Sequence, residues 1–179
     1  MKLVLFIPMF LVGCSTLTLE KCEDLKWFEL GMADGKDVKR SHHFFAHQSS
    51  CNGKSDRKAY LKGMEQGLGE YCQSKNAFQL GLSGEAYRNI CPTELEKRFL
   101  ARFDLGHQIY RLKTEIEDRS VSIDEYRQQY RYGTGLTDLE RQELVDTIAT
   151  LEEEQKSDAA LIQKLFAEAK LSGLIETIP

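Results

Sequence analysis

The spacing of aromatic residues and glycines constrains the fold of this chain most. In residues 14–179 an aromatic residue stands three positions before a glycine at six places, whereas this composition predicts about one such pair by chance. On a helix, residues spaced by three and four positions lie on one face. The pattern therefore predicts helices that carry a bulky ring beside a strip without side chains. The six pairs are Phe28/Gly31, Tyr60/Gly63, Phe78/Gly81, Phe103/Gly106, Tyr130/Gly133 and Tyr132/Gly135.

Two interpretations of the glycine strips remain open. Each interior glycine costs up to about 1 kcal/mol of helix propensity, so a close contact must offset that cost. The favoured interpretation is tight helix packing, in which glycine lets two backbones approach. The alternative is a shallow groove for a sugar, peptide or lipid chain, with Asp34, Tyr60, Gly63 and Gly67 as its candidate residues. In the packing interpretation Asp34 bonds to a neighbouring backbone group or tyrosine.

Residues 1–13 have the layout of a secretory signal peptide. A lysine at position 2 precedes about ten apolar residues, too few for a bilayer span of roughly 20. The run ends in Leu-Val-Gly-Cys at residues 11–14, which resembles the lipobox of bacterial lipoproteins. We therefore expect acyl chains such as palmitate on Cys14, which would supply the two anchors that stable membrane attachment requires. Ser15, in place of an aspartate, suggests the periplasmic face of the outer membrane.

The charge balance makes nucleic acid an unsuitable ligand. Without residues 1–13 the chain has 23 basic and 28 acidic side chains, a net charge of about −5. It also lacks the basic stripe that binds a phosphate backbone. We expect no nucleic-acid partner and no cofactor.

Four cysteines remain besides Cys14: Cys22, Cys51, Cys72 and Cys91. An even number in an exported chain predicts disulfides, and four cysteines allow three pairings. We favour Cys22–Cys51 together with Cys72–Cys91, because each pair could close a local helical hairpin.

The composition changes near residue 92. Glycine, aromatic residues and cysteine are frequent in residues 22–92, whereas residues 93–179 are charged and contain no cysteine. We expect an all-α protein with a signal peptide (1–13), a lipidated tether (14–21), a small disulfide-bonded helical domain (22–92) and a charged helical region (93–179). Thr93, Ser122 and Thr137 each precede a glutamate by three positions, which is typical of a capping box. They predict a helix of about 25 residues, a short helix and a long one. We expect the long helix to pack on the preceding one as a helical hairpin, with a coiled-coil-like tail as the alternative.

The order of motifs in residues 22–115 resembles one family. The motifs are Trp27-x-x-x-Gly31-x-x-Asp34-Gly35, Tyr60-x-x-Gly63-x-x-x-Gly67-Leu68-x-x-Tyr71-Cys72 and Phe78-x-x-Gly81-x-x-Gly84-x-x-Tyr87-x-x-x-Cys91-Pro92. They are similar to the uncharacterised Gram-negative lipoprotein family called domain of unknown function 2799. The resemblance implies lipoprotein status and paired cysteines, and it implies no activity and no catalytic residue. Residues beyond about 120 lie outside it.

A histidine cluster suggests a metal site. If residues 43–51 form a helix, His43, His47 and Cys51 lie on one face, and two histidines four positions apart are a known ligand spacing. Against this, a bridged Cys51 cannot bind metal, and the glutamate of a His-Glu-x-x-His motif is missing. Surface histidines are the simpler interpretation. The chain also lacks a Gly-x-Ser-x-Gly elbow, so no catalytic residue is assigned.

Two hypotheses for function follow. The first is a non-enzymatic envelope protein, attached to the membrane by lipid, whose C-terminal helices contact an envelope partner or a second copy. The second is a periplasmic ligand- or metal-binding module, with or without hydrolytic activity, that uses His42, His43, His47 and Asp34.

Overall fold

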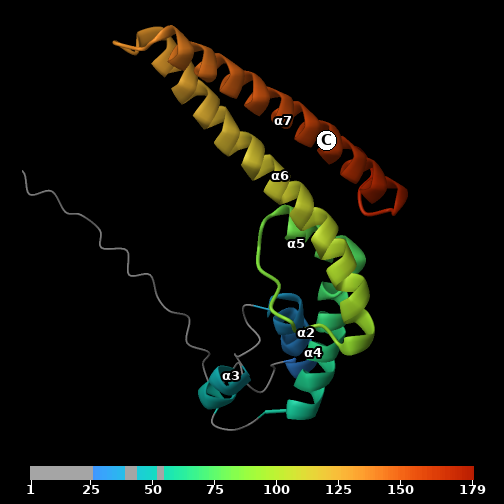
Figure 1. Cartoon of the computed structure of the whole chain (residues 1–179). Coiled ribbons are helices and arrows are strands. Elements are labelled where there is room, and N and C mark those ends of the chain that lie inside the picture. The colour runs from blue at the N-terminus through green and yellow to red at the C-terminus, as the bar shows by residue number, and fades with distance from the viewer. Residues whose placement is uncertain (1–25, 39–43, 52–54) are drawn as a thin grey trace, which may run out of the picture. The chain divides into compact units, whose positions relative to one another are not determined.

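The computed structural model describes residues 26–38, 44–51 and 55–179, and the regular elements in these ranges are helices (Figure 1). They are α2 (Trp27–Lys36), α3 (Phe44–Ser50), α4 (Arg57–Tyr71), α5 (Ser74–Leu82), α6 (Thr93–Tyr132) and α7 (Asp138–Leu171). The predicted all-α class is confirmed. None of the described helices is long and apolar enough to cross a membrane. The predictions for Cys14, Cys22, His42 and His43 fall outside the described residues.

The chain divides into two compact units, Met1–Leu68 and Gly69–Pro179. In the first unit, α2 crosses α4, and α3 packs beside them through Phe44. The Phe44 ring lies 4.9 Å from that of Tyr60 and 6.0 Å from that of Trp27, measured between centroids. These three rings and Cys51 form the buried core of the unit. The predicted domain boundaries remain predictions.

The second unit has its main core where α5, α6 and the C-terminal part of α7 meet. Aliphatic residues of α6 recur at spacings of three and four, which places them on one face towards α7. The core residues are Phe78, Leu105, Ile109, Leu112, Ile162, Leu165, Phe166, Ala169 and Leu174. The predicted helical hairpin is confirmed, because α6 and α7 run side by side over most of their length (Figure 1).

Helix α6 is a single helix of 40 residues, so the predicted break before residue 122 is wrong. The Ser122 hydroxyl donates to the Asp118 carbonyl inside the helix and does not cap a new one. The next residue, Ile123, is buried within the same continuous helix. The predicted capping box at Thr93 is also wrong, since Pro92 holds the capping position without a side-chain bond.

Helix α7 begins as predicted. The Thr137 hydroxyl accepts the Glu140 amide, and the Glu140 carboxylate accepts the Thr137 amide, which is a complete capping box. The preceding turn contains Gly135 with φ of +80°, a conformation that glycine adopts without strain. This turn reverses the chain and sets α7 antiparallel to α6.

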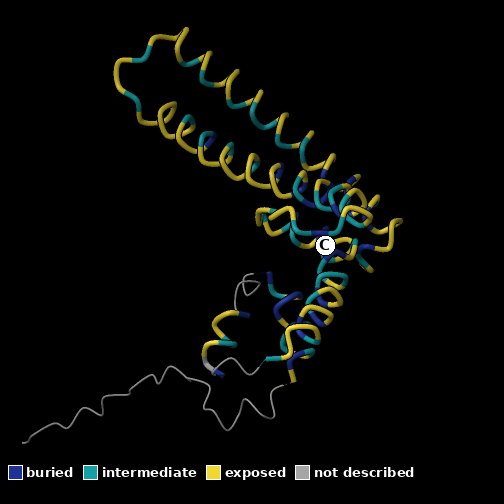
Figure 2. Tube along the Cα trace, turned by 90° about the horizontal axis from the view of Figure 1, so that it is seen from below, coloured by how far each residue is buried: buried dark blue, intermediate teal, exposed yellow. Residues whose placement is uncertain are grey.

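We call the part of the hairpin nearest this turn, residues 113–132 with 138–160, the arm. Its residues are mostly exposed (Figure 2). Polar contacts cross the seam between its two helices: Arg119 binds Asp158 at 2.6 Å, and Arg127 binds Glu152 at 2.7 Å. The arm therefore consists of two helices joined by a narrow apolar seam and ion pairs.

Candidate functional site

The glycines of α2 and α4 face each other in a reciprocal contact. A Cβ atom on Gly31 would collide with the backbone carbonyl of Tyr60, and one on Gly63 would collide with that of Phe28. The contact is reciprocal because each of these carbonyls belongs to the aromatic residue of an aromatic–glycine pair. The glycine of one helix lies against the aromatic residue of the pair in the other helix. No side chain larger than hydrogen fits at either position without moving a backbone.

The second glycines of the two helices extend this contact by one turn. A Cβ atom on Gly35 would meet the Met64 carbonyl, and one on Gly67 would meet the Met32 carbonyl. The candidate groove residues Gly63 and Gly67 are therefore covered by α2. The structure gives them the role of close helix packing, which was the favoured interpretation of the sequence.

A polar cluster is buried beside this contact. The Tyr60 hydroxyl donates to Oδ2 of Asp34 at 2.7 Å, and Nε2 of His47 lies 3.7 Å from the same oxygen. Asp34 and Tyr60 are each 1% exposed. Burial, and then the hydrogen bond to Asp34, raise the pKa of Tyr60 above its ordinary value. The hydroxyl therefore stays protonated and serves as a donor to the carboxylate.

The three side chains come from three helices, namely Asp34 from α2, His47 from α3 and Tyr60 from α4. This arrangement resembles a catalytic cluster in composition, but Asp34 and Tyr60 have almost no surface that a substrate could touch. A buried polar group is stable only when it is hydrogen-bonded. The cluster therefore brings together polar side chains of three helices, and two of these side chains, Asp34 and Tyr60, are inaccessible from the surface.

The predicted metal site has only part of its residues in the described chain. His47 is described, whereas His42 and His43 are not. Cys51 forms a disulfide, so its sulfur is not a thiolate ligand. Among the described residues, no group of three or more His, Cys, Asp or Glu side chains could hold a metal ion.

Helices α5 and α6 repeat the reciprocal glycine contact. A Cβ atom on Gly81 would collide with the Phe103 carbonyl, and one on Gly106 would collide with the Phe78 carbonyl. The aromatic residue again precedes each glycine by three positions, as in α2 and α4. The first four of the six aromatic–glycine pairs named above thus form two equivalent helix crossings.

A disulfide joins Cys72, after α4, to Cys91, before α6, with a Cα–Cα distance of 5.7 Å. This confirms the predicted Cys72–Cys91 pair. The bridge is buried beside Phe99, whose ring stacks on that of Tyr71 at 5.6 Å between centroids. The predicted partner of Cys51, Cys22, lies outside the described residues.

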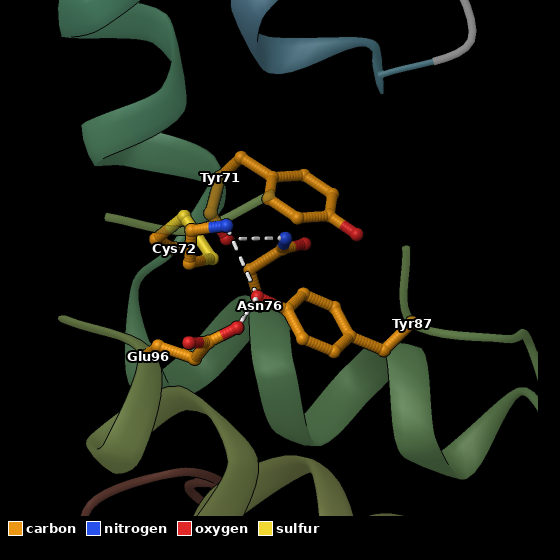
Figure 3. Close-up of a disulfide and its surroundings, with 6 residues drawn as sticks. Tyr71, Cys72, Asn76, Tyr87 and Glu96 are labelled. Atoms are coloured by element: carbon orange, nitrogen blue, oxygen red, sulfur yellow. Dashed lines mark hydrogen bonds between the residues drawn. A yellow bond between two sulfur atoms is a disulfide. The ribbon is translucent and has the colours of Figure 1, made fainter. Parts of the chain in front are cut away.

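Tyr87 holds the segment between the two bridged cysteines. Its hydroxyl accepts the Cys91 amide at 3.0 Å and donates to the Glu96 carboxylate at 3.1 Å (Figure 3). On the other side of the bridge, the Asn76 amide donates to the Tyr71 carbonyl at 2.7 Å. The bond between Tyr87 and Glu96 was not predicted, because Glu96 was expected to complete a capping box with Thr93. The sequence feature that indicated a contact near the bridge was Tyr87 itself, which stands four positions before Cys91.

Residues 26–108 match the family described as "Protein of unknown function (DUF2799)". This segment is a DUF2799 domain. No curated protein and no solved structure matches the chain significantly. The DUF2799 segment begins at α2 and ends two residues after Gly106, so it contains both glycine crossings and the Cys72–Cys91 bridge. It excludes the arm and α7. The resemblance noted from the sequence motifs is therefore confirmed at the level of the family.

Proposed function

We propose that this chain is a lipoprotein of the cell envelope, attached through Cys14 to the periplasmic face of the outer membrane, and that its arm binds an envelope partner or a second copy. The Leu-Val-Gly-Cys sequence at residues 11–14, directly after the apolar run, carries the anchoring part of the proposal. The Cys72–Cys91 disulfide supports it, because such bridges persist in oxidising compartments.

We prefer a structural or interaction role to an enzymatic one because buried polar side chains of the DUF2799 domain bond to one another. Asp34, the acidic residue of greatest interest in the sequence, is buried and accepts a hydrogen bond from Tyr60. It holds helices together where no substrate can reach it. The alternative of a metal-binding or hydrolytic module is not adopted, because its candidate Asp34 is buried against Tyr60 and the sulfur of Cys51 is bridged.

The arm supports the interaction part of the proposal. Large apolar side chains lie exposed on it, including Tyr132 at 77%, Leu139 at 69% and Val145. Exposed aromatic and aliphatic groups are characteristic of the centre of protein interfaces. The arm has only two helices to bury its apolar residues, so a further protein surface would cover those that remain exposed.

The anchor is tested with Cys14→Ser in the full chain. Metabolic labelling with radioactive palmitate should label the parent and leave the variant unlabelled, and the variant should move from the membrane fraction to the soluble periplasmic fraction. A variant that remains labelled and membrane-bound would rule out Cys14 as the anchor.

The arm is tested by photocrosslinking in intact cells. A photoreactive amino acid at Leu139 should give specific products, whose masses distinguish a second copy from another protein. The same amino acid at the exposed Lys97, at the start of α6, is the control. Identical products from the two positions would show that the arm has no specific partner.

A further inference from the structure

The outward side of α4 differs from the rest of this acidic chain. Arg57, Lys58, Leu61 and Lys62 are all exposed, and their spacing puts them on one side of the helix. The opposite side carries the glycines that pack on α2. We call these four residues the α4 outer face. Leu61 is 50% exposed between the basic side chains.

The acidic residues around this face neutralise it only in part. Asp56 precedes α4 and its carboxylate accepts the Ala59 amide, so it serves as a cap. Glu65 follows one turn after Leu61 and is the single acidic side chain in residues 57–66. Residues 56–65 therefore keep a net charge of +1 around the exposed leucine, although the chain as a whole has a net charge of −4.

We propose that the α4 outer face binds the surface of a bilayer that contains anionic phospholipids. Lysine and arginine side chains reach phosphate groups at the membrane surface while their methylene stems lie along apolar material. An exposed leucine between them enters the boundary between headgroups and acyl chains, as in helices that lie on membranes. This combination of charges and leucine fits an anionic bilayer surface.

Its position in the sequence favours a membrane over another anionic partner. Under the function proposed above, on which this step rests, Cys14 is held in the bilayer. Eleven residues separate it from Lys26, the first described residue, and an extended chain of this length spans at most about 40 Å. The unit that contains α4 is then held close to the lipid surface. Such tethering raises the effective concentration to roughly millimolar, so a weak binding face is sufficient.

The expected loss of vesicle binding follows from the number of basic side chains that are replaced. Each basic side chain near an anionic surface strengthens binding by about five-fold. Replacing all three by glutamate should therefore weaken binding by at least about 100-fold. Leu61→Ser should weaken it by about ten-fold, through the loss of apolar burial.

The test uses the mature chain without acyl chains, produced without residues 1–13 and with Cys14→Ser. Cosedimentation with vesicles measures its binding to an equal mixture of phosphatidylglycerol and phosphatidylcholine, and to phosphatidylcholine alone. The test variant combines Arg57→Glu, Lys58→Glu and Lys62→Glu. A matched control reverses one arginine and two lysines elsewhere, with Lys97→Glu, Arg98→Glu and Lys164→Glu, all at exposed positions of the second unit. Thermal denaturation checks that both variants are folded.

We expect the parent and the control to bind the anionic vesicles, with weaker binding at higher salt, and the test variant to lose that binding. Equal binding to both lipid compositions, or equal loss in the test and control variants, would overturn the proposal. Because the vesicle experiment uses no acyl anchor, its result is independent of Cys14. Failure of the palmitate labelling would refute the anchor and leave the vesicle result standing.

Discussion

The Tyr60 hydroxyl donates a hydrogen bond of 2.7 Å to the carboxylate of Asp34, and both side chains are almost completely buried. The two residues come from α4 and α2, the helices that meet through their glycines. Glycine strips alone allow two helices to slide, because they have no side chains to interlock. A buried polar pair has both partners satisfied in only one register. The hydrogen bond thus fixes the register that the glycines make possible.

Tyr60→Phe removes the donor and keeps the ring. The buried Asp34 carboxylate then lacks its short hydrogen bond, so we expect the free energy of unfolding to fall by about 1–3 kcal/mol. Urea denaturation of the soluble chain measures this. Tyr132→Phe, at an exposed position, is the control and should change the stability by less than about 0.5 kcal/mol. An equal effect of both substitutions would mean that Tyr60 contributes through its ring alone.

Alkaline pH should reveal the same hydrogen bond. Burial and the bond to Asp34 raise the pKa of Tyr60 above its ordinary value of 10.0, so the folded chain holds this proton more tightly than the unfolded chain. The resulting stabilisation is fully present below about pH 10 and is lost as the pH rises towards the folded pKa. Between about pH 9 and 11, the urea midpoint should therefore fall less steeply in Tyr60→Phe than in the parent. Parallel slopes would contradict this.

The glycine crossing gives opposite predictions for two glycines of α4. Gly63→Ala forces a methyl group against the Phe28 carbonyl. It should lower the free energy of unfolding by about 1–3 kcal/mol. Gly69 has open space at its Cβ position, so Gly69→Ala should stabilise the helix by up to about 1 kcal/mol. Melting temperatures of the two variants test this contrast. If both substitutions shift the melting temperature in the same direction, the crossing does not depend on contact at Gly63.

The Cys72–Cys91 bridge should contribute about 3 kcal/mol by closing its loop. A double Cys72→Ser, Cys91→Ser variant should unfold at correspondingly lower urea. In the parent, alkylation without a reductant should modify neither cysteine, and mass spectrometry of the peptides would show this. Modification of both would mean that the bridge is absent from the native chain.

Much of the fold could be predicted because the decisive signals are local. Gly63 and Gly67 indicate a close contact, since helical spacing alone puts them on one face. Thr137 and Glu140 cap α7 within a single turn. Cys72 and Cys91 are close enough in sequence to suggest their pairing, although the spacing did not exclude the other two pairings.

Other features depend on contacts between distant residues and could not be found in this way. Asp34 and Tyr60 are 26 residues apart, and periodicity shows which face a residue occupies without showing which helix lies opposite. His47 and Asp34, which the ligand-binding hypothesis names together, lie 3.7 Å apart, but helical spacing did not show that α3 and α2 meet there. Ser122 has the local signal of a helix start, but burial of the neighbouring Ile123 keeps α6 continuous.

Arg119 should be the main polar link of the arm. Its guanidinium lies 2.6 Å from Asp158, 3.1 Å from Glu154 and 3.9 Å from Glu115. The hydrogen bond to Asp158 and the charges of the three carboxylates raise the pKa of Arg119 above its ordinary value. Arg119→Ala leaves three carboxylates close together without their cation, so we expect a loss of about 1–2 kcal/mol. The arm has few buried residues, so the loss should appear there first, as faster hydrogen exchange in residues 113–126 and 147–160. Exchange in the core around Ile109 should stay slow.

Added salt should partly restore the slower exchange of Arg119→Ala by screening the carboxylates. Arg131→Ala, at an exposed position near the end of α6, is the matched control, and an equal acceleration in both variants would show that the helices of the arm are held by their apolar seam alone.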